Sequence, residues 1–162
     1  MRFLVLFITL FFCVCCADTP AIIQETEVLA EEVRPLPALP KYFRVSNLAA
    51  EKIKGWGPLS GMMSQMQDLP NATTEETLSL NLEALESACK DLESAPFPEP
   101  FNISEIQSRV KVVRTFIQKA QSELSYNLDF SASLVQAVRA YNALLRQIDR
   151  VTEQEDPGEI PF

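Results

Sequence analysis

The chain has 162 residues, a formal net charge of −8 and no histidine. This length allows one domain, and its apolar content is sufficient for a packed core. Without histidine, the usual metal-binding and haem-binding sites of helical proteins cannot form, and the acidic balance argues against a nucleic-acid partner.

Residues 1–17 have the order of a secretory signal. Arg2 precedes an apolar run over residues 3–14, and small residues followed by Asp18 come next. A basic start, a short apolar stretch and small residues before the cleavage point define such signals. The run is also shorter than the roughly 20 residues that span a bilayer. We therefore predict cleavage after Ala17 and a secreted, extracellular mature chain.

A second interpretation of the same segment stays open. Cleavage before Cys16 would leave an N-terminal cysteine, so the segment resembles a bacterial lipoprotein signal, although Cys13 and Cys15 depart from the residues usual there. The chain would then be a membrane-anchored envelope protein with a structural or protein-binding role. One acyl chain binds membranes only marginally, so several would be needed. Without lipidation, we expect no membrane association.

Residues 18–41 form an acidic lead. Ile22, Leu29 and Val33 fall on one face of a short amphipathic helix, which is followed by the proline-rich sequence at 35–40. Repeated prolines favour an extended linker, so we expect the packed domain to begin at residue 42.

The first long helix is predicted over residues 46–68. An apolar side chain recurs every three or four residues, at Ile53, Trp56, Leu59, Met63 and Met66. The segment Gly55–Pro58 interrupts this pattern, because proline inside a helix removes a hydrogen bond. We therefore expect either a kink or two abutting helices, and the apolar pattern that continues across the interruption favours the kink.

The second helix is predicted to begin with a capping box between Thr73 and Glu76. Its apolar positions are Leu78, Leu82, Leu85, Cys89 and Leu92. The proline-rich segment 95–101 cannot continue a helix and is expected to be a stiff loop.

The third helix is predicted to be capped by Asn102 with Glu105, and the fourth to begin near Ser131. The apolar positions are Ile106, Val110, Val113, Ile117, Ala120 and Leu124 in the third, and Leu134, Val138, Tyr141, Leu145 and Ile148 in the fourth. Residues 152–162 are expected to form a disordered acidic tail.

Four amphipathic helices with short connections predict an all-α fold, an up-down-up-down antiparallel four-helix bundle over residues 42–151. The second helix is acidic, whereas the third and fourth carry Arg109, Arg114, Arg146 and Arg150. These arginines could form a basic patch for an acidic partner. We prefer pairing with the second helix, which would help to select neighbouring faces.

Few side chains suggest chemistry. The apolar positions are nearly all aliphatic, so we predict no catalytic residue, cofactor or metal site. We expect Cys89 to be a buried hydrophobic residue rather than a reactive thiol, and Met62, Met63 and Met66 to fill gaps in the core around Trp56.

Asn71 and Asn102 each begin an Asn-X-Ser/Thr acceptor for N-glycosylation. Both also lie where helix starts favour asparagine, serine or threonine, so unmodified capping segments are the alternative. The sequence therefore predicts a secreted helical protein that binds an unknown protein or small molecule, as a ligand, effector or carrier. Its oligomeric state stays open.

Overall fold

A computed structural model describes residues 36–155 of the chain. This range is all-helical and contains no strand. Its elements are α2 (Asn47–Ile53), α3 (Gly57–Asp68), the short 3₁₀ helix η1 (Leu69–Asn71), α4 (Glu75–Ser94), α5 (Ser104–Ser125) and α6 (Ser131–Glu155). The all-α prediction is confirmed. The predicted signal, Cys16, the acidic lead up to residue 35 and the end of the predicted tail lie outside the described residues.

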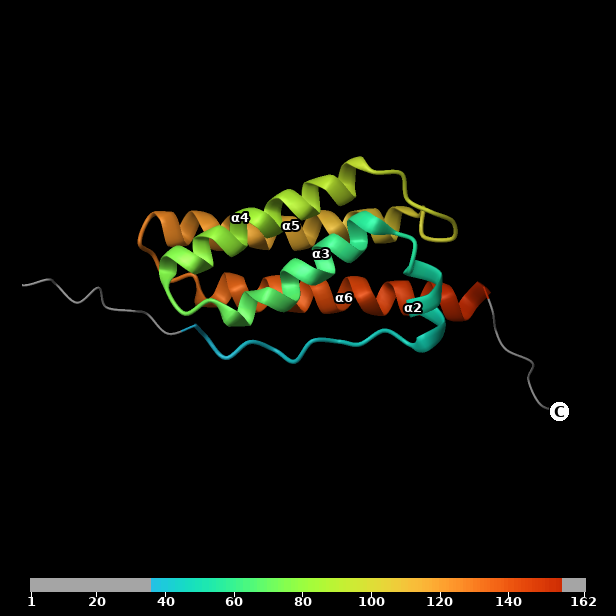
Figure 1. Cartoon of the computed structure of the whole chain (residues 1–162), viewed down its shortest axis with the longest axis horizontal. Coiled ribbons are helices and arrows are strands. Elements are labelled where there is room, and N and C mark those ends of the chain that lie inside the picture. The colour runs from blue at the N-terminus through green and yellow to red at the C-terminus, as the bar shows by residue number, and fades with distance from the viewer. Residues whose placement is uncertain (1–35, 156–162) are drawn as a thin grey trace, which may run out of the picture. The chain divides into compact units, whose positions relative to one another are not determined.

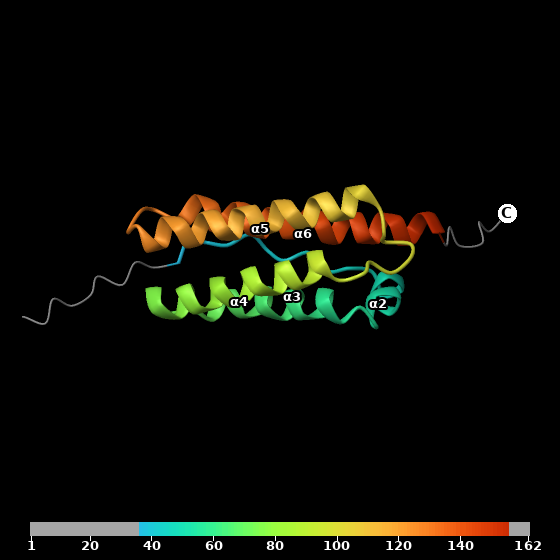
Figure 2. The ribbon, with the colours of Figure 1, turned by 90° about the horizontal axis from the view of Figure 1, so that it is seen from above.

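The helices pack against one another in chain order. α3 contacts α4, α4 contacts α5, α5 contacts α6, and the short α2 contacts α6. Successive long helices run in opposite directions, as their colours show in Figure 1. Viewed from above, α5 and α6 form one layer and α3 and α4 the other (Figure 2).

The predicted apolar positions of the three longest helices are confirmed as core. Every one of those positions in α4, α5 and α6 is buried. Burial on α6 extends further than predicted, because α6 is covered by α5 on one side and by α2 and residues 36–46 on others. The additional buried residues of α6 are Ser133, Ala137, Asn142, Leu144, Gln147, Val151 and Thr152.

Of the two alternatives for residues 46–68, the favoured kinked helix is wrong and two separate helices are observed. α2 begins after Ser46, whose Oγ accepts a hydrogen bond from the Ala49 N–H at 3.2 Å, and α2 ends at Ile53. Pro58 then lies in the first turn of α3. A proline there loses no intrahelical hydrogen bond, so it begins a second helix instead of bending the first.

Two predicted caps are also wrong. Thr74, not Thr73, caps α4, and its reciprocal partner is Thr77 rather than Glu76. Ile103 occupies the N-cap position of α5, with no side-chain cap. The side-chain Oδ1 of Asn102 instead accepts a hydrogen bond from the side-chain Nε2 of Gln107 at 3.0 Å.

The end of the last helix differs from the prediction as well. α6 begins at Ser131 as expected, but it continues to Glu155. Thr152, predicted to begin a disordered tail, is fully buried, and its hydroxyl donates to the Ile148 carbonyl at 3.0 Å. The last turn is therefore held by packing.

Residues 36–46, here called the strap, form no regular secondary structure. They follow the seam between the two helix layers (Figures 1 and 2). Leu36 and Leu39 pack against the core, so the packed region includes residues that we expected to belong to the linker before residue 42. The strap is thus part of the fold rather than a spacer.

One buried side chain holds the strap on α6. The Asn142 carbonyl accepts from the Phe43 N–H at 2.8 Å, and the Asn142 amide donates to the Lys41 carbonyl at 2.9 Å. Asp149 accepts from the Ser46 N–H at 2.8 Å. Three residues of extended chain and seven of helix both span about 10 Å, so the strap and α6 run in the same direction with matched spacing.

Candidate functional site

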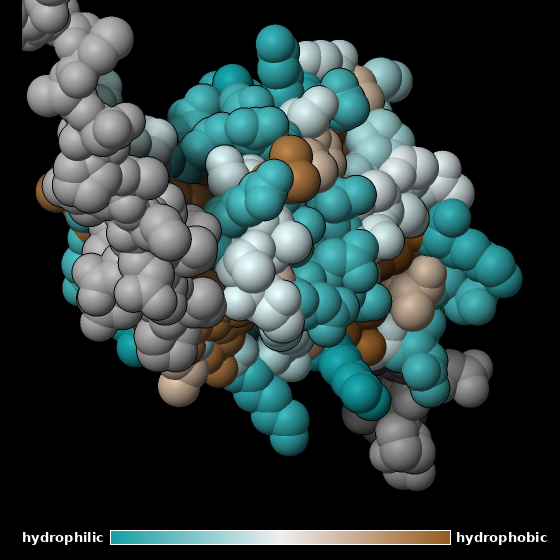
Figure 3. Space-filling model, turned by 60° about the vertical axis from the view of Figure 1, so that its left-hand side comes forward, coloured by the Kyte–Doolittle hydropathy of each residue, from teal (hydrophilic) through white to brown (hydrophobic). Residues whose placement is uncertain are grey.

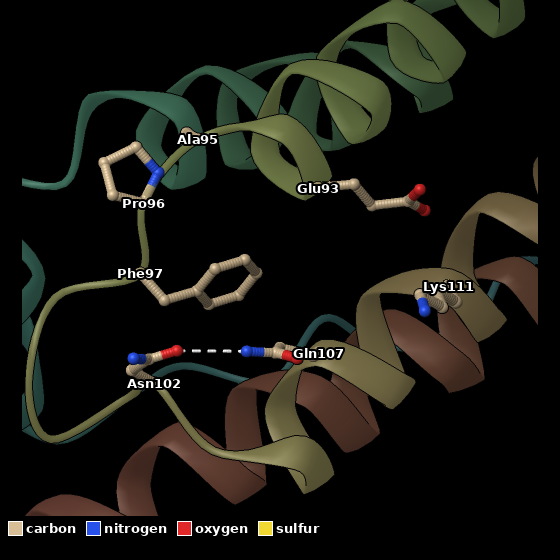
Figure 4. A pocket seen from close by; sticks show the side chains of 7 residues that line it. All are labelled: Glu93, Ala95, Pro96, Phe97, Asn102, Gln107 and Lys111. Carbon is tan, nitrogen blue, oxygen red and sulfur yellow. Dashed lines mark hydrogen bonds between the residues drawn. The ribbon is translucent and has the colours of Figure 1, made fainter.

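Two surface grooves are the candidate sites of the described region. The first groove has a volume of about 330 Å³ and lies where the end of α4, the α4–α5 loop and the start of α5 meet (Figure 4). It is lined by Glu93, Ala95, Pro96, Phe97, Asn102, Gln107 and Lys111.

Aromatic packing fixes the loop that forms this groove. The Trp56 ring lies edge-on to Phe97, with centroids 5.1 Å apart, and stacks on Phe101 at 5.6 Å. Such pairs add stability beyond the area that they bury. Phe101 is fully buried, so the loop is anchored from below while the Phe97 ring projects along the groove wall (Figure 4).

The polar side of the first groove rests on an ion-pair cluster between α4 and α5. Arg114 donates to Glu86 through Nε at 2.9 Å and Nη2 at 2.7 Å, and to Glu93 through Nη1 at 3.1 Å. The hydrogen bond to Glu86 is the largest cause of a raised Arg114 pKa. The charge of Glu93 is therefore compensated, whereas Lys111 has no ion pair within residues 36–155.

The second groove, of about 390 Å³, lies between the strap, α3 and α6. Tyr42 and Tyr141 meet edge to face in its wall, with ring centroids 6.0 Å apart. Burial raises the pKa of each tyrosine from 10 to about 12. Phe43, Arg44, Val45, Met63 and Gln67 complete the lining.

Sequence reasoning did not find the second groove. Four of its residues come from 42–45, which lie between the expected linker and the expected first helix and to which we assigned no element. The aromatic residues at 42 and 43 were the available signal, because two adjacent large rings are unusual in a solvated spacer.

The predicted buried cysteine is confirmed. Cys89 is fully buried in α4, and burial, followed by the nearby Glu93, raises its pKa to about 12. A thiol in this environment stays protonated and unreactive. The methionines are divided: Met62 and Met66 are fully buried, whereas Met63 is half-buried and lines the second groove.

The expected pairing of four arginines with the second helix holds only for Arg114. Arg146 instead lies over the Phe43 ring, with its guanidinium carbon 5.0 Å from the centroid. Arg150 donates to Gln147, and Arg109 has no ion pair within the described range. α4 packs mainly against α3 and α5, whereas α6 packs mainly against α5, which explains why the arginines of α6 do not reach α4.

Asn71 and Asn102 are both exposed and outside the α-helices. Asn71 ends η1, and Asn102 lies at the rim of the first groove. The structure leaves N-glycosylation as a prediction.

Residues 36–155 contain no cluster of three or more cysteine, aspartate or glutamate side chains arranged to hold a metal ion. In the same range, no helix is long and apolar enough to cross a bilayer. The space-filling view in Figure 3 shows a mostly hydrophilic face on which the hydrophobic areas are small and separate.

No protein-family model, curated protein or solved structure matches this chain.

Proposed function

We propose that this chain is an exported helical-bundle protein that acts by binding a partner rather than by catalysis. α3, α4, α5 and α6 would serve as an up-down-up-down four-helix scaffold, with α2 and the strap added along one seam. The observation that carries the proposal is the division of side chains. The helices bury continuous aliphatic faces, while aromatic and cationic groups line two surface grooves.

Export is supported by the sequence alone. Residues 1–17 combine one basic residue, a short apolar run and small residues before Asp18, the pattern of a cleaved signal. The second groove is lined by three aromatic residues with a few polar groups, a composition typical of sites for small molecules. Together, these features favour a carrier or effector outside the cell.

The intact mass of the exported protein tests this proposal. The full chain, expressed with its own N-terminus in a secreting host, should appear in the medium with a mature chain beginning near Asp18. Retention inside the cell with Met1 still present would contradict export. The measurement needs no assumption about the partner.

The same mass measurement distinguishes secretion from the lipid-anchored alternative. A mature chain beginning at Cys16 and carrying acyl groups would replace the secreted form by an envelope protein. The control is Cys16→Ser, which should leave secretion unchanged if cleavage follows Ala17. A wild-type protein that enters the detergent phase, with a Cys16→Ser variant that does not, would establish the anchor instead.

A further inference from the structure

The second groove joins an apolar wall to unpaired positive charge. Val45, Met63 and the rings of Tyr42 and Tyr141 supply the apolar surface. Arg44 lies in the lining itself, and Arg146 covers the Phe43 ring at 5.0 Å. The described lining includes no aspartate or glutamate, so the charge of the groove is positive.

Neither arginine is neutralised within the described region. The ion pairs of residues 36–155 use other cations, namely Lys52, Lys54, Arg114 and Lys119. Asp149, one turn beyond Arg146 on α6, accepts the Ser46 N–H at 2.8 Å and forms no ion pair with either arginine. Guanidinium groups favour carboxylates and phosphates, which they bind through paired hydrogen bonds.

The groove is formed before any ligand arrives. Asn142 bonds the backbone on both sides of Tyr42, through the Lys41 carbonyl and the Phe43 N–H, and is only 4% exposed. Asp149 fixes the strap again at Ser46. Residues 42–45 are therefore held at both ends, which reduces the conformational entropy that a ligand must remove on binding.

We propose that the second groove binds a small amphipathic anion, such as a medium-chain carboxylate. Its acidic group pairs with Arg44, and its alkyl or aryl body packs against Met63, Val45 and Tyr141. The volume of about 390 Å³ lies within the range of small-molecule sites. Met63 on its flexible stem adapts to the shape of the body. This inference rests on the proposed function and names the ligand class for it.

Decanoate, used below its micelle concentration, is the probe. Calorimetric titration of the purified mature protein should show one site per chain. Arg44→Gln should weaken binding by about tenfold, because it removes a charge-assisted contact. Met63→Glu places a carboxylate in the apolar wall and should abolish binding. Decyltrimethylammonium, which has the same tail with a cationic head, should not bind.

Lys111→Gln is the matched control. It removes a cation from the first groove and should leave decanoate affinity unchanged. The inference is overturned if wild type shows no saturable binding, if Lys111→Gln weakens binding while Arg44→Gln does not, or if the cationic probe binds equally well. Arg44-dependent binding to phosphatidylglycerol vesicles without binding to decanoate would also overturn it, in favour of a membrane surface. Circular dichroism checks that each variant is folded. Arg44 is exposed, so its replacement should not disturb the core.

Failure here is distinguishable from failure of the proposed function. A protein that is secreted but does not bind decanoate overturns the ligand class and leaves export standing. A protein that binds decanoate but is never secreted supports the ligand class and overturns export.

Discussion

At the scale of single residues, Asn142 has the greatest structural consequence. It is a polar side chain on the buried face of α6, where an unpaired amide would be costly. Both of its polar atoms are satisfied by strap backbone rather than by another helix. The asparagine therefore selects which part of the strap docks on α6, since only residues with a free N–H and C=O at the correct spacing can pair with it.

Replacing Asn142 by alanine should destabilise the fold through the strap. The change leaves the Phe43 N–H and the Lys41 carbonyl without partners, so the free energy of unfolding should fall by about 2–3 kcal/mol. Urea denaturation measures this loss. Hydrogen exchange at the Phe43 amide should accelerate more than exchange in the middle of α5.

Asn81→Ala is the control for that prediction. The Asn81 amide makes one long hydrogen bond, 3.5 Å to the Asp68 carbonyl, so its loss should cost under about 0.5 kcal/mol. Equal effects of the two substitutions would show that Asn142 does not hold the strap.

At the scale of secondary-structure elements, the sequence predicted best where one helix face is buried. Every residue that the spacing predicted as core in α4, α5 and α6 is buried. Local periodicity is sufficient here, because one face of an amphipathic helix packs on the core. It failed between α2 and α3, where the apolar pattern crosses Pro58 without a continuous helix. Periodicity records which side chains are buried, but not whether the backbone between them stays helical.

Trp56, the chain's single tryptophan, lies at the break between α2 and α3. Its side chain is 5% exposed and contacts Phe97 and Phe101 of the α4–α5 loop. Trp56→Ala should therefore lower the free energy of unfolding by about 3–5 kcal/mol. Trp56→Phe keeps one ring and should cost clearly less. Urea unfolding followed by circular dichroism compares the two.

Pro58→Ala gives the matching control. Because Pro58 is in the first turn of α3, alanine there restores no missing helical bond, and stability should change by under about 1 kcal/mol. A large gain in stability would indicate that the proline strains one continuous helix, as the sequence pattern alone suggested.

At the scale of the whole molecule, the long-range pairing between the strap and α6 could not be predicted from the sequence. The strap contacts α6 across about a hundred positions, as in the pairing of Phe43 with Asn142, and no local pattern shows which residue pairs with which. Proline-rich segments also favour extended conformations whether or not they dock. Hence the helices of the bundle were predictable, whereas the second groove, built mainly from the strap, was not.

The two N-glycosylation acceptors test whether the whole chain passes through a secretory pathway. Asn71 follows α3 and Asn102 precedes α5, so the antiparallel helices place them at opposite ends of the bundle (Figure 1). Both are exposed, and a glycan at either position would displace no core side chain. Expressed through a eukaryotic secretory pathway, the protein should carry two N-glycans.

Peptide-N-glycosidase treatment should reduce the mass by both glycans, and Thr73→Ala or Ser104→Ala should each remove one, because the hydroxyl completes the acceptor. These substitutions leave the asparagines in place, so a lost glycan cannot be attributed to a changed Asn102–Gln107 contact. Asn81, an asparagine followed by Leu82 and Glu83 rather than an acceptor sequence, should stay unmodified. Secreted protein that carries no glycan at either site would show that these asparagines serve only the local structure of the helix starts.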